Sequence, residues 1–330
     1  MEDTTLLTAP KYIDDLVAKI NKSKRRVTMI ALVISEDKAT KSLIDALCNA
    51  SERGVIVNVA MDLYFTYKEI EASAKRMDYI QKQSRALRAT KKRLNKSGVH
   101  VRWLGQYGFL IISRRTHTKW SVVDDTVYSF GGVNLHHSGI KSVDYMLRTT
   151  DKRLAERIAA EHDFVIATDN AKRAYPSHTI DFNDEKIHID GGRLFDSAIY
   201  ERVLELASQS KSAIYVSQYC PTGRLANLLN KIDTEYYFNS PENAHDFMNK
   251  ALIKFAMART GIKTKYTNKR YLHAKCIIFT LENNQKVAIS GSHNFVGLGV
   301  IAGTREAALE TRDPKIIAQL ESFIEKEVKS

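Results

Sequence analysis

Two histidine–lysine pairs in the chain have a spacing that suits chemistry on a phosphate group. His117 precedes Lys119 by two positions, and His273 precedes Lys275 by two positions. If each pair begins a β-strand, the alternation of side chains places the histidine and the lysine on one face. There the lysine can offset the negative charge of a phosphate while the imidazole attacks phosphorus or delivers a proton. An imidazole pKa of about 6.5 suits both roles at neutral pH.

Each pair is followed by a glycine-containing segment that ends in asparagine. The first segment is Gly131-Gly-Val-Asn134, and the second is Gly291-Ser-His-Asn294. Glycines let the backbone approach a ligand closely, and an asparagine side chain can donate to a phosphate oxygen. A single histidine–lysine pair arises easily by chance, whereas two copies at matching positions do not. We therefore predict that the two lysines, Asn134 and Asn294 hold a phosphate on which the two histidines act.

The elements that would position these pairs occur twice along the chain. In the first half we expect strands at residues 26–34, 55–62, 99–104, 119–124, 127–130 and 144–148, and helices at 12–21, 41–53, 68–96 and 151–167. In the second half we expect strands at residues 212–219, 235–238, 262–266, 274–280, 286–290 and 307–311, and helices at 195–210, 225–232, 242–260 and 314–326.

Alternating strands and helices indicate an α/β fold made of two repeated α/β/α sandwich halves with mixed sheets. Each half carries one histidine–lysine pair. The first half is expected to span residues 1–175 and the second residues 190–330. The polar segment 176–189 is interpreted as the linker between them.

Bulk properties of the 330 residues narrow the function classes. The formal net charge of +12 and the isoelectric point of about 9.4 predict a polyanionic partner, either nucleic acid or an anionic membrane surface. No apolar run approaches the roughly 18 residues of a membrane span, and the N-terminus lacks a signal-peptide pattern. Three widely spaced cysteines fit a reducing, cytoplasmic setting. No carboxylate cluster or His/Cys set suggests a metal site, so neither metal nor cofactor is expected.

The paired motifs resemble the HKD motifs of the phospholipase D superfamily, and the resemblance spans nearly the whole chain. In that superfamily two such halves pack face to face and share one active site. The resemblance implies a catalytic set of His117, Lys119, Asp124, His273 and Lys275 that works without a metal. It further implies that His117 forms a phosphohistidine intermediate and that His273 serves as acid and base.

The second motif departs from the pattern, because Thr280 stands where an aspartate is expected. One interpretation is a decayed, inactive half. The other is that this position is structural and that the histidines are oriented by acids beyond the asparagine segments, where Asp144 and Glu306 lie at suitable places. On that interpretation, Asp124 and Thr280 bond to nearby backbone.

Within the superfamily, the chain looks most like bacterial cardiolipin synthases, which transfer a phosphatidyl group between phosphatidylglycerol molecules. The resembling features are Arg53-Gly-Val, Gly131-Gly-Val-Asn-Leu, Gln218-Tyr-Cys-Pro, and Gly291-Ser-His-Asn with Arg305-Glu306. The resemblance implies a phospholipid substrate and peripheral attachment to the inner face of the membrane. A phospholipase D-type hydrolase, a phosphatidylserine synthase, a metal-independent nuclease and an inactive phosphate-binding scaffold remain alternatives.

A basic stretch at residues 75–96 bears on the partner but does not decide it. It contains nine Lys or Arg residues with a few apolar residues between them. Such a helix could lie on anionic lipid, follow nucleic-acid phosphates, or be a solvated helix face packed by its apolar residues. The oligomeric state cannot be predicted from the sequence.

Overall fold

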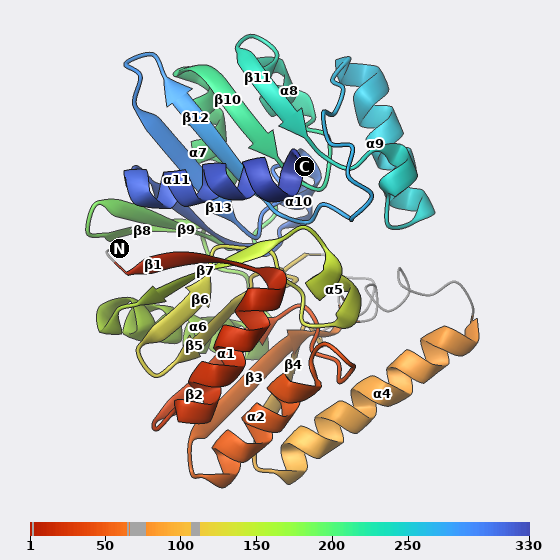
Figure 1. Ribbon diagram of the computed structural model, residues 1–330, viewed down its shortest axis with the longest axis vertical. Coiled ribbons are helices and arrows are strands. Elements are labelled where there is room, and N and C mark those ends of the chain that lie inside the picture. The colour runs from red at the N-terminus through yellow and green to blue at the C-terminus, as the bar shows by residue number, and fades with distance from the viewer. Residues whose placement is uncertain (2, 65, 67–76, 107–112) are drawn as a thin grey trace. The chain divides into compact units, whose positions relative to one another are not determined.

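The chain folds into two compact units (Figure 1). The computed structural model describes residues 1, 3–64, 66, 77–106 and 113–330, and the side chains of helix α4 from Arg85 onward. Unit 1 comprises Met1–Ser129, Val133–Lys141 and Tyr145–Tyr175. Unit 2 comprises Pro176–Ser330 and two short segments of the first half, Phe130–Gly132 and Ser142–Asp144.

Unit 1 contains a mixed seven-stranded sheet in the order β1-β7-β6-β5-β2-β3-β4. Its strands are β1 (Thr4–Thr8), β2 (Arg26–Ala31), β3 (Ile56–Asp62), β4 (His100–Leu104), β5 (Trp120–Val123), β6 (Thr126–Ser129) and β7 (Tyr145–Thr150). The described helices are α1 (Ala9–Lys22), α2 (Lys41–Glu52), α4 (Met77–Lys96), α5 (His137–Lys141) and α6 (Lys152–Asn170). β2, β3 and β4 pair in parallel, and the remaining pairs are antiparallel.

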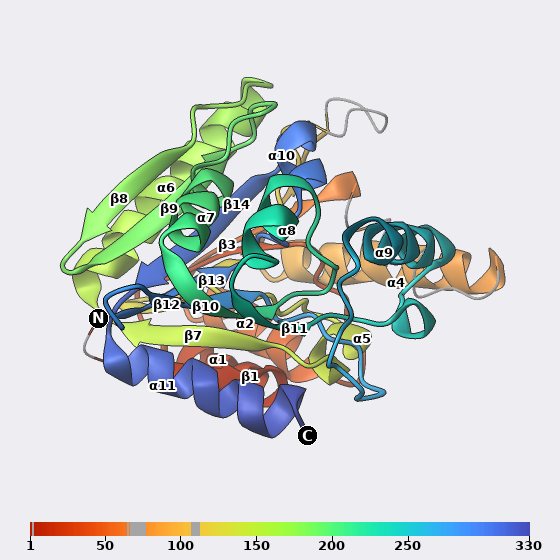
Figure 2. The same cartoon turned by 90° about the horizontal axis from the view of Figure 1, so that it is seen from above.

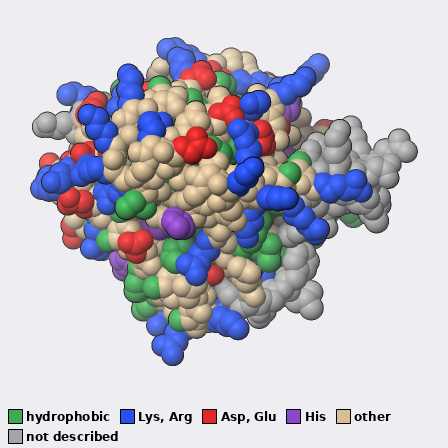
Figure 3. Space-filling model, turned by 90° about the horizontal axis from the view of Figure 1, so that it is seen from below, with side chains coloured by type: hydrophobic (Ala, Val, Ile, Leu, Met, Phe, Trp, Pro, Cys, Tyr) green, Lys and Arg blue, Asp and Glu red, His purple; other side chains and the backbone are tan. Residues whose placement is uncertain are grey.

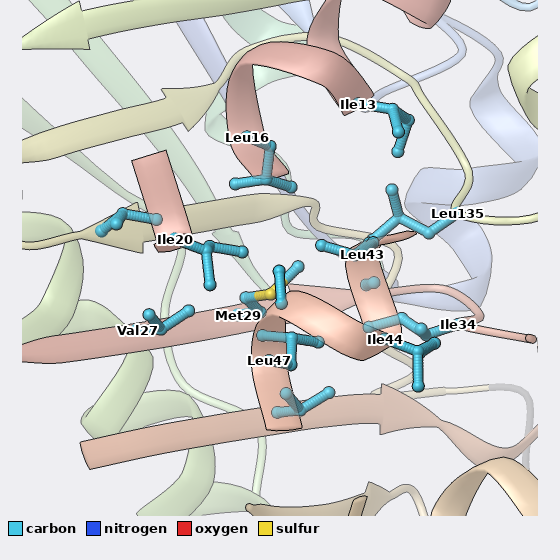
Figure 4. Packing of buried hydrophobic residues seen from close by; sticks show 14 of the residues in the cluster. Ile13, Leu16, Ile20, Val27, Met29, Ile34, Leu43, Ile44, Leu47 and Leu135 are labelled. Carbon is cyan, nitrogen blue, oxygen red and sulfur yellow. The ribbon is translucent and has the colours of Figure 1, made fainter. Parts of the chain in front are cut away.

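The core of unit 1 forms where α1 and α2 pack on β2 (Figure 4). Leu16 and Ile20 of α1 recur at helical spacing, so both face the sheet. They meet Met29 of β2 and Leu47 of α2, all of them buried. Full burial of one such side chain contributes about 1.5–3 kcal/mol. This layer holds β2 in place, and β2 pairs with β5, the strand that follows His117 and Lys119.

Unit 2 contains a second mixed sheet in the order β11-β10-β12-β13-β14-β9-β8. Its strands are β8 (His178–Phe182), β9 (Glu185–Gly191), β10 (Ser210–Val216), β11 (Asp233–Tyr237), β12 (Cys276–Leu281), β13 (Lys286–Gly291) and β14 (Arg305–Thr311). Its helices are α7 (Ala198–Ser208), α8 (Gly223–Leu229), α9 (Phe247–Thr260), α10 (Gly297–Ala302) and α11 (Pro314–Phe323), with the 3-10 turn η1 (Pro241–Asn243) and the π turn η2 (Ile324–Val328). Figure 2 shows α7 and α8 on one face of this sheet and α11 on the other.

Two sequence predictions about these elements were wrong. The expected linker 176–189 instead forms β8 and most of β9, because alternate apolar residues such as Ile187 and Ile189 are buried in the sheet. The expected strand 262–266 is irregular. It runs beside β11 and bonds to it through the N–H of Lys265 and the hydroxyl of Thr264, without forming a continuous ladder.

Other expectations are only partly tested. The expected helix at 68–96 is observed from Met77, and residues 67–76 lie outside the described residues. Throughout the described ranges, no helix is both long enough and apolar enough to cross a bilayer.

Candidate active site

His273 of the second motif is held by a buried carboxylate from the first half of the chain. Its Nδ1 lies 2.7 Å from Oδ2 of Asp144, and both side chains are buried within unit 2. An ionised carboxylate only accepts hydrogen bonds, so the imidazole proton is fixed on Nδ1 and Nε2 becomes the reacting nitrogen. The N–H groups of His273 and Ala274 both donate to the carbonyl of Val143 at 3.0 Å. These bonds align the two chain segments.

Gly132 provides the space in which the Asp144 carboxylate lies. A Cβ atom at Gly132 would lie 2.7 Å from Oδ2 of Asp144 and 3.0 Å from the carbonyl oxygen of His273. Any larger residue would therefore displace the carboxylate. At Gly291 a Cβ atom would meet the carbonyl oxygen of Ala307 in β14 at 2.3 Å. Both glycines thus make room for neighbouring protein groups, where the sequence suggested room for a ligand.

The two motif lysines make the same local contact. Nζ of Lys119 donates to the carbonyl oxygen of His117 at 2.9 Å, and Nζ of Lys275 donates to the carbonyl oxygen of His273. Both lysines are buried, so each holds the backbone of its own histidine and places a positive charge beside it.

Buried polar groups at the end of β3 fix the backbone in front of His117. Oδ2 of Asp62 accepts a hydrogen bond from the N–H of Thr116 at 2.8 Å. The guanidinium of Arg115 donates to the carbonyl oxygen of Gly105 at 2.6 Å. Asp62 and Arg115 are both 0 % exposed. Sequence analysis missed both residues, although a carboxylate that ends a buried strand needs a partner and could have drawn notice.

Asp124 makes the backbone contacts that one of the two interpretations expects, and its catalytic role stays a prediction. Its carboxylate accepts three backbone N–H groups where β2 begins, those of Lys24 and Arg25 at 2.9 Å and that of Arg26 at 3.1 Å. Asp124 follows β5 whereas Lys119 precedes it, so the two residues stand at opposite ends of the strand, roughly 16 Å apart at about 3.3 Å per residue. Burial alone raises the pKa of Asp124, but the three N–H donors outweigh burial and lower the pKa below its ordinary value.

Asn134 and Asn294 follow the two motifs and share an uncommon feature. Oδ1 of each side chain is buried and has no hydrogen-bond partner in the part of the chain that the structure describes. Buried polar atoms are normally satisfied, and an exception marks a place for a ligand or a water molecule. The hydroxyl of Ser217 donates to the carbonyl of Asn294 at 3.0 Å and fixes that backbone. The phosphate-holding role of both asparagines stays a prediction.

Glu306, the second predicted orienting acid, is buried in β14. The hydroxyl of Ser292 donates to its Oε2, and the hydroxyl of Thr304 lies 3.4 Å from its Oε1. In the ladder with β9, Glu306 stands opposite Asp190, which accepts a hydrogen bond from the Ser197 hydroxyl at 2.6 Å. Burial raises the pKa of Asp190 to about 7, and the charge of Glu306 adds to this increase. Sequence analysis found one of these two facing acids and missed Asp190.

Helix α4, a candidate for binding a polyanion, is packed and ion-paired within unit 1. Leu87 and Leu94 are buried, and Arg93 pairs with Glu36 at 2.6 Å and also with Asp45. Of the three interpretations, a helix face packed by its apolar residues fits this part of α4. The basic side chains before position 85 lie outside the described residues.

Metal-ligating residues do not gather in the described ranges: no three His, Cys, Asp or Glu side chains there could hold one metal ion. The three cysteines, Cys48, Cys220 and Cys276, are all buried, and no disulfide joins any two of them. Burial raises the pKa of the Cys220 thiol to about 11, which makes it a poor nucleophile.

Comparison with known proteins relates this geometry to one superfamily. Residues 16–164 match the family model of the phospholipase D-like domain of cardiolipin synthase. Among curated protein sequences, none matches the chain. The structure of phosphatidylserine synthase from Haemophilus influenzae Rd KW20 has a TM-score of 0.70 and 14% identity, covering 99% of this chain and 87% of that one.

Two further solved structures match the chain over different lengths. Polyphosphate kinase from Porphyromonas gingivalis has a TM-score of 0.60 and 12% identity, covering 98% of this chain and 50% of that one. The phospholipase D family member Nuc from Salmonella typhimurium has a TM-score of 0.37 and 17% identity, covering 50% of this chain and 93% of that one.

The predicted phospholipase D fold and the resemblance to that superfamily are confirmed. The sequence match covers much of the first half, and the fold similarity to the phosphatidylserine synthase extends over nearly the whole chain. The prediction of a phosphodiester-cleaving or phosphodiester-transferring enzyme agrees with the match of residues 16–164 to a phospholipase D-like domain.

Proposed function

From this phospholipase D-like fold, we propose that the chain is a phosphatidyltransferase that moves a phosphatidyl group from one phosphatidylglycerol to another, as a cardiolipin synthase does. The observation that carries the proposal is the buried His273–Asp144 pair beside Gly132. The match of residues 16–164 to the cardiolipin synthase domain supports the choice of substrate. A carboxylate-oriented imidazole next to a buried ammonium group is suited to exchanging the alcohols of a phosphodiester.

In the first step, the imidazole of His117 attacks the phosphorus of phosphatidylglycerol. The bond between phosphorus and the oxygen of the departing glycerol breaks, and His273 gives its Nε2 proton to that oxygen. Glycerol leaves, and the phosphatidyl group stays bound to His117. Lys119 and Lys275 offset the charge that develops on the phosphate oxygens.

In the second step, His273 is neutral and takes the proton from a hydroxyl of a second phosphatidylglycerol. The hydroxyl oxygen attacks phosphorus, the bond between phosphorus and His117 breaks, and cardiolipin leaves. Asp144 accepts a hydrogen bond from Nδ1 of His273, so Nε2 is the nitrogen that gives and takes the proton in both steps. Asn134 and Asn294 hold the phosphate in both steps.

The same proposal places the protein on the inner face of the membrane as a peripheral protein. Phosphatidylglycerol is an anionic membrane lipid, and the net charge of +12 is attractive to such a surface. Nucleic acid is the alternative polyanion, and the product assay separates the two.

The test is a product assay by mass spectrometry on phosphatidylglycerol liposomes in the presence of a chelator, with single-stranded DNA in a parallel tube. We expect cardiolipin and free glycerol in equal amounts and intact DNA. The His117→Ala protein, prepared identically, should give neither product.

Each other product pattern would replace the proposal with a defined alternative. Phosphatidic acid without cardiolipin would make the chain a hydrolase. Phosphatidylserine formed when serine is supplied would make it a phosphatidylserine synthase. Degraded DNA with unchanged lipid would make it a nuclease.

A further inference from the structure

Helix α9 exposes apolar side chains although its opposite face is already packed. Ile253 and Ala256 are buried in a cluster with Phe238 and Ile262. The exposed face carries four large apolar side chains, Phe247 (86 % exposed), Met248 (58 %), Leu252 (43 %) and Phe255 (65 %). Single exposed apolar residues are common, but four on one helix of 14 residues mark an interaction surface.

These side chains form one continuous stripe along the helix. At 3.6 residues per turn, the exposed apolar positions fall within an arc of ~140°, namely Phe247, Met248, Ala251, Leu252, Phe255 and Ala258. Lys250 and Lys254 border one edge of the arc, and Arg259 lies near the other edge. Long basic side chains beside an apolar stripe are typical of a helix that lies in the interface of an anionic bilayer.

The charge around the stripe has a single sign. Residues 247–281 contain eight Lys or Arg residues and no Asp or Glu. Several of these basic side chains are exposed, namely Lys254, Arg259, Lys263, Lys265 and Lys269. On the face drawn in Figure 3, by contrast, Lys and Arg side chains are scattered and interrupted by Asp and Glu. The surface around α9 is therefore complementary to a partner whose surface is negatively charged and whose interior is apolar.

The N-terminal end of α9 is tied to the backbone that carries the second motif. His245, just before the helix, packs edge-on against Tyr271 with ring centroids 4.9 Å apart. The ring of Tyr271 lies in turn 6.2 Å from that of His273. Phe247, the most exposed residue of the stripe, is the first residue of α9. A partner that binds the apolar stripe of α9 therefore comes close to the segment that contains His273.

We propose that α9 is the surface by which the protein docks on an anionic phospholipid bilayer. Phe247, Met248, Leu252 and Phe255 enter the headgroup region, and the surrounding lysines and arginine contact lipid phosphates. Docking brings His273 to the layer in which phosphatidyl groups lie. This inference rests on the proposed function, because it supplies the reason for contact with a membrane.

The first test is co-sedimentation of the full chain with vesicles of phosphatidylcholine alone or mixed with phosphatidylglycerol. We expect binding to the mixed vesicles that weakens as salt rises. The double variant Phe247→Ser/Phe255→Ser should bind them at least ~10-fold more weakly, because it lacks the two aromatic side chains whose transfer from water into the bilayer favours binding. Phe164→Ser removes an aromatic residue of α6 that is 46 % exposed and should leave binding unchanged. Undiminished binding of the double variant would refute the inference.

A second pair of variants tests the charge. Lys254→Glu/Arg259→Glu should abolish the preference for phosphatidylglycerol, whereas Lys315→Glu on α11 should not. If the Phe double variant converted a dimer to a monomer in size-exclusion chromatography while vesicle binding persisted, α9 would be an interface between copies of the chain. That result would overturn the inference.

Failure of the inference and failure of the proposed function can be told apart. His117→Ala should bind mixed vesicles as the wild type does, since α9 is unchanged. Vesicle binding that depends on α9, without any lipid product, would support the inference and refute the proposed function. Cardiolipin formation in detergent micelles, together with vesicle binding that the α9 variants do not weaken, would support the proposed function and refute the inference.

Discussion

The two halves of the chain build the same six-stranded frame and differ at its edges. In unit 1 the shared order is β1-β7-β6-β5-β2-β3, and in unit 2 it is β9-β14-β13-β12-β10-β11. In both, only the last pair of this series is parallel. Unit 1 adds β4 beside β3, whereas unit 2 adds β8 beside β9. The frame positions the motif strands β5 and β12, and the edges vary without disturbing them.

Helices α4 and α9 show how far corresponding elements have diverged. In chain order, each lies between the last strand of the shared frame, β3 or β11, and the motif strand, β5 or β12. In α4, Arg93 is ion-paired with Glu36, and the described apolar residues Leu87 and Leu94 are buried. In α9, Phe247 and Phe255 face solvent. The frame sets the place of each helix, while its outer face is free to acquire a separate role.

Loss of either reactive histidine should have the largest effect, if both halves serve one reaction. His117→Ala and His273→Ala should each lower the turnover of phosphatidylglycerol by about 10⁴-fold or more, because each removes a group that forms or breaks a bond. Initial rates of glycerol release measure this. His100→Ala, an exposed histidine on β4, is the matched control and should have no effect. Full activity of one motif variant would show that a single half suffices.

Asp144 distinguishes the second motif, and its replacement should have the next largest effect. Asp144→Asn should lower kcat by about 10³-fold with little change in KM, because the imidazole of His273 loses the acceptor that fixes its tautomer. Gly132→Ala should lower kcat by displacing the same carboxylate. The measurement is steady-state kinetics on micellar phosphatidylglycerol. An unchanged kcat in Asp144→Asn would show that His273 needs no orienting acid.

Much of the frame could be predicted from the sequence because its signals are local. Leu43, Ile44 and Leu47 recur at helical spacing and predict α2, whose observed bounds agree with the prediction to within one residue. The glycine after that helix marks the change to the buried strand β3. The two histidine–lysine motifs were found for the same reason, since each is a contiguous pattern at the start of a strand.

The parts that were missed depend on contacts between distant residues. β8 and β9 carry His, Asp and Lys on one face, which in the sequence indicates an exposed polar segment, yet His188 and Asp190 of that face are buried in the folded sheet. The facing of Asp190 and Glu306 depends on the register of that pairing. Asp62 accepts a hydrogen bond from the backbone of Thr116, which is more than fifty positions away in the sequence. No local sequence pattern predicts such a contact.

Asp190 introduces a pH dependence into unit 2. Its pKa is raised to about 7, so between about pH 4 and pH 7 the folded state keeps a proton that the unfolded state releases. Stability therefore falls as pH rises across this window, by up to about 4 kcal/mol at about 1.4 kcal/mol per pH unit. The asparagine side chain in Asp190→Asn cannot titrate, so this variant should not lose stability in this way. From about pH 4 to pH 7 its free energy of unfolding should therefore rise relative to that of the wild type. Denaturant unfolding at several pH values measures the difference, and parallel pH profiles would contradict the assignment.

The smallest effects should come from Asp124 and Thr280, the matching positions at which the motifs differ in sequence. Asp124→Asn should lower the free energy of unfolding by about 1–2 kcal/mol, since an amide nitrogen then faces backbone N–H donors. Because the pKa of Asp124 is lowered by those donors, its stabilising contribution is lost as the pH falls, and the difference should shrink below about pH 4. Thr280 takes part in the β12 ladder opposite Lys286, and Thr280→Val should change stability by less than about 0.5 kcal/mol. Both variants should keep wild-type kcat. A loss of kcat in Asp124→Asn as large as that in Asp144→Asn would show that Asp124 takes part in catalysis and that the two motifs are not equivalent.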